Sequence, residues 1–349
     1  MYWPLRLESE SESESGSSSD SELEETESEH DSDEDETPDE DPDEDPDEEP
    51  DEDPRPETVA ETVAETVLVT VVAKPVEPVE PVAPVAAVEP VVPVVPVAPG
   101  VSSTVLIQPF PIDLLRPAVT DHLQADSYGS KTVVIGKAGT GKSTIIKSLL
   151  YEKQAIFPVG LVLSGTEDSN GFYGQFFPPS FIVQGYSEPK LKTFIERQKR
   201  ARRELTNPWA LLLIDDCMDE IGVFRTKTQY ALYKNGRHFK MLYIVAMQYA
   251  RDVPPAVRAN IDTTFILREA SLHNRKILYE NYAGIIPTFA LFCHIMDTVT
   301  VHYTALVIHN TSASNCWQDC VYWYRAVTVP ADFRFGCQTF WDYHNGLIT

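Results

Sequence analysis

The sequence of 349 residues has few cysteines and no long apolar run. Its five cysteines are an odd number, so they cannot all pair with one another, and free thiols in a reducing compartment are the expected state. No apolar run reaches the ~18 residues that a bilayer-spanning helix needs, so no membrane partner is expected. Residues 1–19 contain no apolar signal core, and the protein is therefore not expected to be secreted.

Basic residues are scarce in the first 100 positions. Residues 1–100 hold 33 of the 54 Asp and Glu but three of the 28 Lys and Arg, so their formal charge is −30 and residues 101–349 carry +4. The negative charges of the D-P-D-E repeats repel one another, and the Val/Pro-rich segment that follows favours an extended backbone. We expect residues 1–100 to be a disordered arm and residues 101–349 to be one packed domain. The arm either contacts a basic partner or serves as a solubilising spacer.

A phosphate-binding loop is the most specific motif in the chain. Residues 136–143 read G-K-A-G-T-G-K-S, after an apolar strand pattern at 132–135 and before a helix pattern at 144–150. The glycines let backbone N–H groups surround a phosphate, Lys142 adds a positive charge, and the Ser143 hydroxyl suits Mg²⁺. The sequence therefore predicts an ATP site made of Gly136, Lys137, Ala138, Gly139, Thr140, Gly141, Lys142, Ser143 and Thr144.

A pair of acids follows a second apolar run. Residues 210–214 read A-L-L-L-I, which predicts a strand buried on both faces, and Asp215-Asp216 come directly after it. Carboxylates at the end of a parallel strand lie where open α/β sheets bind ligands. Asp215 is the candidate Mg²⁺ ligand, and Asp216 the candidate group that orients or deprotonates water. The alternative is that both acids cap the next helix.

Three further apolar runs predict strands at 159–163, 241–247 and 263–267. Gln248 ends the run at 241–247, and it is either a group that senses the γ-phosphate or an ordinary polar residue at a strand end. Strands that alternate with helical stretches indicate an α/β P-loop NTPase fold, with a mostly parallel sheet and helices on both faces.

Several segments together resemble the genome-packaging ATPases of the FtsK–HerA superfamily, as found in poxviruses, other large nucleocytoplasmic DNA viruses, virophages and polinton-like elements. Besides the phosphate loop, the resemblance includes S-G-T-E-D-S-N-G-F-Y at 164–173 and L-L-L-I-D-D-C at 211–217. It continues with N-G-R-H at 235–238, I-V-A-M-Q at 244–248, P-P-A-V-R-A-N at 254–260 and V-Y-W-Y-R-A at 321–326.

The resemblance implies a RecA-like core that hydrolyses ATP with Mg²⁺, assembles into a homo-oligomeric ring and moves double-stranded DNA into a capsid. It implies Gln248 as the γ-phosphate sensor and an arginine finger from a neighbouring subunit, with Arg258 and Arg237 as the two candidates. A capsid or portal-vertex protein is the implied docking partner, and the virion or the host cell, in a cytoplasmic factory or the nucleus, is the implied location. The family pattern does not include the acidic arm.

Residues 189–204 predict a helix that is rich in bases. Leu191, Phe194 and Ile195 form its inward face, and seven bases lie between Lys190 and Arg203. This helix is a candidate DNA-backbone contact, a solvated surface, or a nuclear import signal at K-R-A-R-R. Cys316 and Cys320 have histidines nearby in sequence, but their spacing favours buried thiols over zinc.

Three functions fit these patterns. The first is an ATP-driven motor that packages viral DNA. The second is another P-loop translocase or helicase that acts in replication or DNA transfer. The third is a virion or scaffolding protein that acts mainly through its acidic arm, although intact Lys142, Ser143, Asp215 and Asp216 argue against a decayed nucleotide site.

Overall fold

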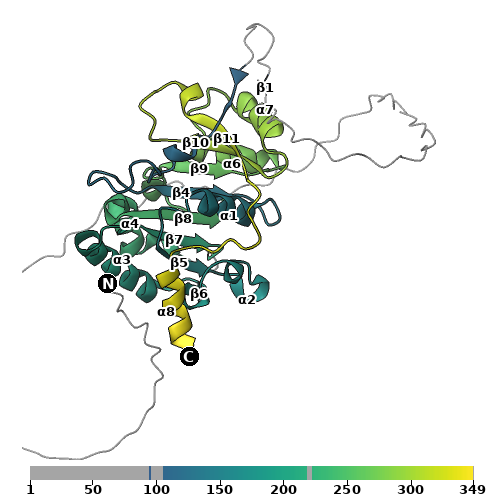
Figure 1. Cartoon of the computed structure of the whole chain (residues 1–349). Coiled ribbons are helices and arrows are strands. Elements are labelled where there is room, and N and C mark those ends of the chain that lie inside the picture. The colour runs from purple at the N-terminus through teal and green to yellow at the C-terminus, as the bar shows by residue number, and fades with distance from the viewer. Residues whose placement is uncertain (1–93, 96–104, 218–221, 349) are drawn as a thin grey trace, which may run out of the picture. The chain divides into compact units, whose positions relative to one another are not determined.

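The computed structural model describes residues 94–95, 105–217 and 222–348. Nine of the described strands form one sheet in the order β3-β11-β10-β9-β4-β8-β7-β5-β6 (Figure 1). Only β10 runs against its neighbours in this sheet, so the fold is mostly parallel. The strands are β3 (Gln108–Pro109), β4 (Lys131–Ile135), β5 (Val159–Ser164), β6 (Ile182–Gln184), β7 (Ala210–Asp215), β8 (Met241–Met247), β9 (Thr263–Ile266), β10 (Thr304–His309) and β11 (Val321–Arg325).

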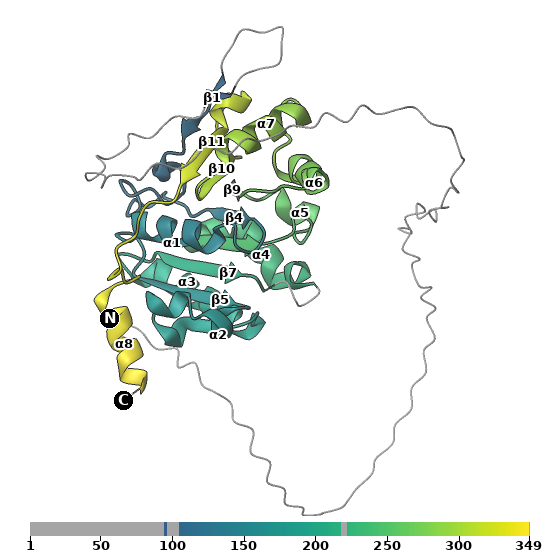
Figure 2. The same cartoon turned by 90° about the vertical axis from the view of Figure 1, so that its right-hand side faces the viewer.

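Helices connect the parallel strands and cover both faces of the sheet. Along the chain, the connection from β4 to β5 moves toward the β6 edge of the sheet. The connections from β6 to β7, from β7 to β8 and from β8 to β9 move in the opposite direction, toward the β3 edge. Because such crossovers are right-handed, α1 lies on one face and α3 and α4 on the other (Figure 2). The helices are α1 (Lys142–Glu152), α2 (Glu167–Asn170), α3 (Glu188–Glu204), α4 (Lys227–Asn235), α5 (Pro255–Arg258), α6 (Leu272–Tyr282), α7 (Phe289–Val299) and α8 (Gln338–Ile348).

The centre of the sheet is fully buried. Every residue of β4, β5, β7 and β8 is buried, which is what continuous apolar runs in a helix-covered parallel sheet require. Aromatic side chains fill the space between the sheet and its cover, such as Phe177, which stacks on Phe335 at 4.8 Å between ring centroids. This rigid platform fixes the loops that follow the strand ends.

The sheet order places β8 between β4 and β7. The segments that leave the carboxyl ends of these three strands are the phosphate loop after β4, Asp216 after β7 and Gln248 after β8. Parallel strands bring such ends to one edge. The predicted α/β fold is confirmed, and each strand inferred at 132–135, 159–163, 210–214, 241–247 and 263–267 is present within one or two residues.

The predicted disordered arm lies almost wholly outside the described residues. Its described part is β1 (Val94–Val95), which pairs antiparallel with β2 (Val105–Leu106). Among the described residues, no helix has the length and apolar character that crossing a bilayer requires.

Candidate nucleotide site

The phosphate loop turns through two glycines in the left-handed region. Gly139 has φ +74° and Gly141 has φ +105°, values that residues with a Cβ rarely adopt. Thr140 closes the loop on itself, because its backbone N–H and its hydroxyl both donate to the Lys137 carbonyl, at 3.2 and 2.7 Å. These two hydrogen bonds help to hold the loop in its curved form.

The helix after the loop begins without a side-chain cap. Gly141 is the N-cap of α1 and carries no capping group, whereas Thr226, Ser271 and Thr288 cap α4, α6 and α7 with their hydroxyls. The first N–H groups of α1 are thus left for an external acceptor, and the positive end of the helix dipole lies beside them. An anion such as a phosphate fits this end of the helix.

Lys142, Asp216 and Gln248 meet next to the loop. The Lys142 side chain is 6% exposed, and its Nζ lies 3.3 Å from Asp216 Oδ2. Gln248 Nε2 donates to the same carboxylate oxygen at 3.4 Å. The residues that the sequence assigns to phosphate, water and γ-phosphate sensing therefore converge, although they come from three different strand ends.

Asp215 is buried beside a tyrosine. It is 4% exposed, and its Oδ2 accepts a hydrogen bond of 2.7 Å from the hydroxyl of Tyr173. Burial raises the pKa of Asp215 to about 6, and the Tyr173 hydrogen bond opposes part of that increase. Burial also raises the pKa of Tyr173 well above its ordinary value, so this hydroxyl remains a donor.

The second carboxylate oxygen of Asp215 makes the site suitable for a cation. Asp215 Oδ1 is buried and has no hydrogen-bond partner among the described groups. A carboxylate in that state is stabilised by a hard divalent ion, and Ser143, at the start of α1, supplies the kind of hydroxyl that Mg²⁺ accepts. Asp215 and Ser143 thus fit the predicted Mg²⁺ site by their chemistry.

The segment 164–173 is built around the acidic pair. Asp216 has φ +46°, a strained value for a residue with a side chain, and Gly165 lies directly against its backbone. A Cβ at Gly165 would stand 2.1 Å from the Asp216 carbonyl oxygen. Further along, the Glu167 carboxylate accepts the N–H groups of Tyr173 and Gly174, at 3.0 and 2.7 Å. These contacts fix the turn that brings Tyr173 to Asp215.

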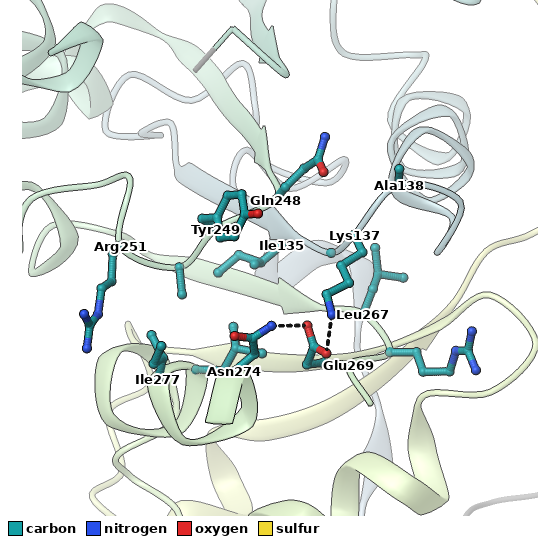
Figure 3. Close-up of a pocket in the computed structure, with 14 residues that line it drawn as sticks. Ile135, Lys137, Ala138, Gln248, Tyr249, Arg251, Leu267, Glu269, Asn274 and Ile277 are labelled. Carbon is teal, nitrogen blue, oxygen red and sulfur yellow. Dashed lines mark hydrogen bonds and ion pairs between the residues drawn. The ribbon is translucent and has the colours of Figure 1, made fainter. Parts of the chain in front are cut away.

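A cavity of about 330 Å³ opens on the Gln248 side of the loop (Figure 3). Lys137 reaches across it to Glu269, with 2.9 Å between Nζ and Oε1. Glu269 also accepts from the Ser271 N–H and from Asn274 at the start of α6. The phosphate loop is therefore tied to the segment between β9 and α6.

The two arginine-finger candidates occupy different places. Arg237 pairs with Asp262, with 3.2 Å between Nη2 and Oδ1. Asp262 also accepts a hydrogen bond from the backbone N–H of Lys131, the first residue of β4. Arg237 therefore lies at the edge of the sheet where the parallel strands begin, away from its own phosphate loop. Arg258 stacks over Tyr282 at 5.7 Å and donates to the Ala250 carbonyl, two residues after Gln248.

The basic helix forms as predicted, as α3, with Leu191, Phe194 and Ile195 buried. Several of its charges have partners within the helix. Lys192 pairs with Glu188 at 3.0 Å, Lys199 with Glu196 at 2.6 Å, and Arg200 lies 3.8 Å from Glu204.

The cysteines are buried only in part. Cys217 and Cys320 are buried, Cys293 is half-buried, and Cys316 and Cys337 are exposed. The prediction of a buried thiol is therefore wrong for Cys316, which lies in the loop before the turn at 317–319 rather than in a strand. All five are free, and no group of three or more His, Cys, Asp or Glu side chains arranged for a metal ion occurs among the residues that the structure describes.

Sequence reasoning did not find Tyr173, Gly165 or Glu269 as site residues. The first two lie inside S-G-T-E-D-S-N-G-F-Y, a segment that we singled out only for its resemblance to the packaging ATPases. No pattern marks Glu269, because its partner Lys137 is 132 residues away in the chain.

Comparison with known proteins identifies relatives over the same region. The family described as "Poxvirus A32 protein" matches residues 120–321. Uncharacterized protein 088R of Invertebrate iridescent virus 3 is 52% identical over 238 residues, covering 67% of this chain and 91% of that protein. Uncharacterized protein 015R of Frog virus 3 is 39% identical over 242 residues, covering 68% of this chain and 74% of that protein.

Solved structures with similarity to this chain include the genome packaging NTPase B204 from Sulfolobus turreted icosahedral virus 2 in complex with ATP-gammaS. It is 14% identical, covers 57% of this chain and 98% of that chain, and has a TM-score of 0.42. EssC from Geobacillus thermodenitrificans is 15% identical, covers 60% of this chain and 41% of that chain, and has a TM-score of 0.41. The extent and identity of the sequence matches decide the assignment: the chain belongs to the Poxvirus A32 protein family, with the P-loop ATPase architecture that its motifs predict.

Proposed function

We propose that the protein is an ATP-hydrolysing motor that translocates double-stranded DNA and packages a viral genome into a capsid. The observation that carries this proposal is the meeting of Lys142, Asp216 and Gln248 beside the curved phosphate loop and a helix without a side-chain cap. Each of these side chains suits one task in phosphoryl transfer to water, a reaction in which enzymes act mainly by positioning the reactants and stabilising charge.

The chain's own residues supply binding and orientation. Backbone N–H groups of residues 136–143 surround the phosphates, and Lys142 neutralises charge on the β- and γ-phosphates. Binding of the triphosphate draws Lys142 away from Asp216, which frees that carboxylate to orient a water molecule or accept its proton. Gln248, already within reach of Asp216, holds the water or the γ-phosphate oxygen.

A bound Mg²⁺ supplies further positive charge at the phosphate oxygens. Ser143 and Asp215 are the residues that would hold it, directly or through water. Tyr173 keeps the Asp215 carboxylate in one orientation through its hydrogen bond.

A ring arrangement would complete the site, because in the described part of the chain no arginine forms a hydrogen bond or ion pair with Lys142, Asp216 or Gln248. Arg258 and Arg237 are the candidate fingers that a neighbouring subunit contributes. The Arg258 contact with the Ala250 carbonyl links it to the segment just after Gln248. We propose that movement of this segment during hydrolysis couples the nucleotide state to DNA.

The DNA contact proposed for α3 rests on bases that remain exposed to solvent. Lys192, Lys199, Arg202 and Arg203 are exposed, and such side chains give sequence-independent binding that weakens with salt. The intrahelical ion pairs reduce the net charge available, so we expect a modest salt slope from this helix alone.

The experiment measures ATP hydrolysis by the full chain with and without double-stranded DNA, with Lys142→Ala as the control. The proposal expects stimulation by duplex DNA and movement along it without strand separation. Unwinding of a forked duplex would instead support a helicase, and hydrolysis that ignores DNA would contradict the translocase. Genome packaging that survives Lys142→Ala would support a role carried by the acidic arm.

A further inference from the structure

A second cleft borders the start of α1, just after the phosphate loop. Its volume is about 330 Å³, and it is lined by Thr144 and Lys147 of α1, by Phe172, and by Tyr303 and residues 325–329. It shares no residue with the cavity beside Gln248. Thr144 directly follows Ser143, and neither Asp216 nor Gln248 lines this cleft. The cleft therefore suits the end of a bound triphosphate that is remote from these two residues.

Tyr303 is held against the loop in an unfavourable backbone conformation. His302 and Tyr303 have φ +50° and +57°, the left-handed region, in two successive residues with side chains. The Tyr303 ring lies so close to Gly141 that a Cβ there would be 2.6 Å from Cδ1. Its side chain nevertheless stays 58% exposed, so packing within the subunit gives little in return for this conformation.

Residues from two of the sequence segments that resemble the packaging ATPases converge on the cleft. Phe172 comes from the segment 164–173, and its ring packs edge-on against Tyr173 and Phe176, with centroids 5.2 and 5.6 Å away. Arg325 and Ala326 come from V-Y-W-Y-R-A, and the Ala326 N–H donates to the Tyr303 carbonyl at 3.3 Å. The cleft thus has fixed aromatic and backbone walls.

These walls suit a flat heteroaromatic ring. Exposed aromatic and guanidinium groups stack on nucleobases, and backbone groups can recognise a base edge. We propose that this cleft binds the purine base of the nucleotide whose phosphates occupy the loop, with the Tyr303 ring stacked on it. This inference rests on the proposed function, and it identifies Tyr303 as a residue that distinguishes a nucleotide from a bare polyphosphate.

The test compares ATP with inorganic tripolyphosphate, which has the same phosphates and no base. Calorimetry with Mg²⁺ on the full chain gives both affinities for the unaltered protein, Tyr303→Ala and Tyr303→Phe. Tyr303→Ala is expected to weaken ATP binding about 10-fold, or about 1.4 kcal/mol, and to leave tripolyphosphate binding unchanged. Tyr303→Phe keeps the ring and is expected to keep the ATP affinity.

Tyr249→Ala is the matched control, because Tyr249 is also an exposed tyrosine, 68% exposed, but lines the cavity on the Gln248 side. It is expected to leave the ratio of the two affinities unchanged. The inference is overturned if Tyr303→Ala binds ATP as the unaltered protein does, if it loses both ligands equally, or if Tyr249→Ala alone abolishes the preference for ATP. An unaltered protein that binds both ligands equally also overturns it, whereas one that binds neither ligand refutes the proposed function itself.

Discussion

Replacing Asp215 with asparagine should stabilise the nucleotide-free protein at alkaline pH. Burial raises the pKa of Asp215 from 3.8 to about 6. Ionising this carboxyl in the folded chain therefore costs about 3 kcal/mol more than ionising it in the unfolded chain. Asparagine has nearly the same shape, stays neutral, and still accepts the Tyr173 hydrogen bond through its amide oxygen.

The sign of the pH dependence follows from the raised pKa. Below about pH 4 the Asp215 carboxyl is protonated in both states, and the variant gains little. As the pH rises from 4 to 6 the unfolded chain loses this proton first, so the unaltered protein loses stability relative to Asp215→Asn. Above pH 6 the difference is expected to level off at up to about 3 kcal/mol.

Urea denaturation of both proteins at pH 4.5 and pH 8, in EDTA and without nucleotide, measures the difference. Comparing the two proteins at each pH cancels the contributions of all other groups. Asp216→Asn is the control, because that carboxylate is partly exposed and paired with Lys142, and it should give no such gain. The reasoning would be refuted if Asp215→Asn were less stable than the unaltered protein at pH 8. It would also be refuted if the difference in stability between the two proteins were the same at pH 4.5 and pH 8. ATP hydrolysis by this variant should be lost even though it is the more stable protein.

Further predictions concern the surroundings of the acidic pair. Tyr173→Phe removes the hydrogen bond to a buried carboxylate, so unfolding in urea at pH 8 should show a loss of about 1.5–3 kcal/mol; an unchanged midpoint would contradict the contact. Gly165→Ala forces a Cβ onto the Asp216 carbonyl and should lower the free energy of unfolding by about 1–3 kcal/mol in the same assay. It should also remove most of the ATPase activity. Gln248→Ala should lower kcat about 100-fold and change KM little in steady-state assays, and an effect on KM alone would argue for a binding role.

Much of the fold was predictable because its central strands are continuous apolar runs. The runs at 210–214 and 241–247 admit few other interpretations in a chain that also carries a phosphate loop, and both form buried strands. The late part of the sheet was harder to foresee. β10 runs antiparallel to its neighbours, and β3 pairs with β11 over two residues. The direction of a strand and the pairing of so short a segment depend on tertiary packing, which the local sequence does not encode.

The residues of the site also include some that the sequence predicts and some that it does not. Lys142, Asp216 and Gln248 were predictable because each follows directly after a recognisable strand or loop, and topology then brings strand ends together. Tyr173 and Tyr303 were not, because a tyrosine near a turn has no distinguishing pattern. Their roles depend on contacts with Asp215 and Gly141, which lie 42 and 162 positions away in the sequence.

The central claim is that residues 136–143 surround a triphosphate whose metal ion lies between Ser143 and Asp215. A crystal structure with Mn²⁺ and a non-hydrolysable ATP analogue, with the metal located by its anomalous scattering, measures this directly. The account predicts one metal peak beside the Ser143 hydroxyl, on the side that faces Asp215, and phosphates within the loop. A metal or triphosphate bound elsewhere on the chain, with the loop left empty, would contradict it.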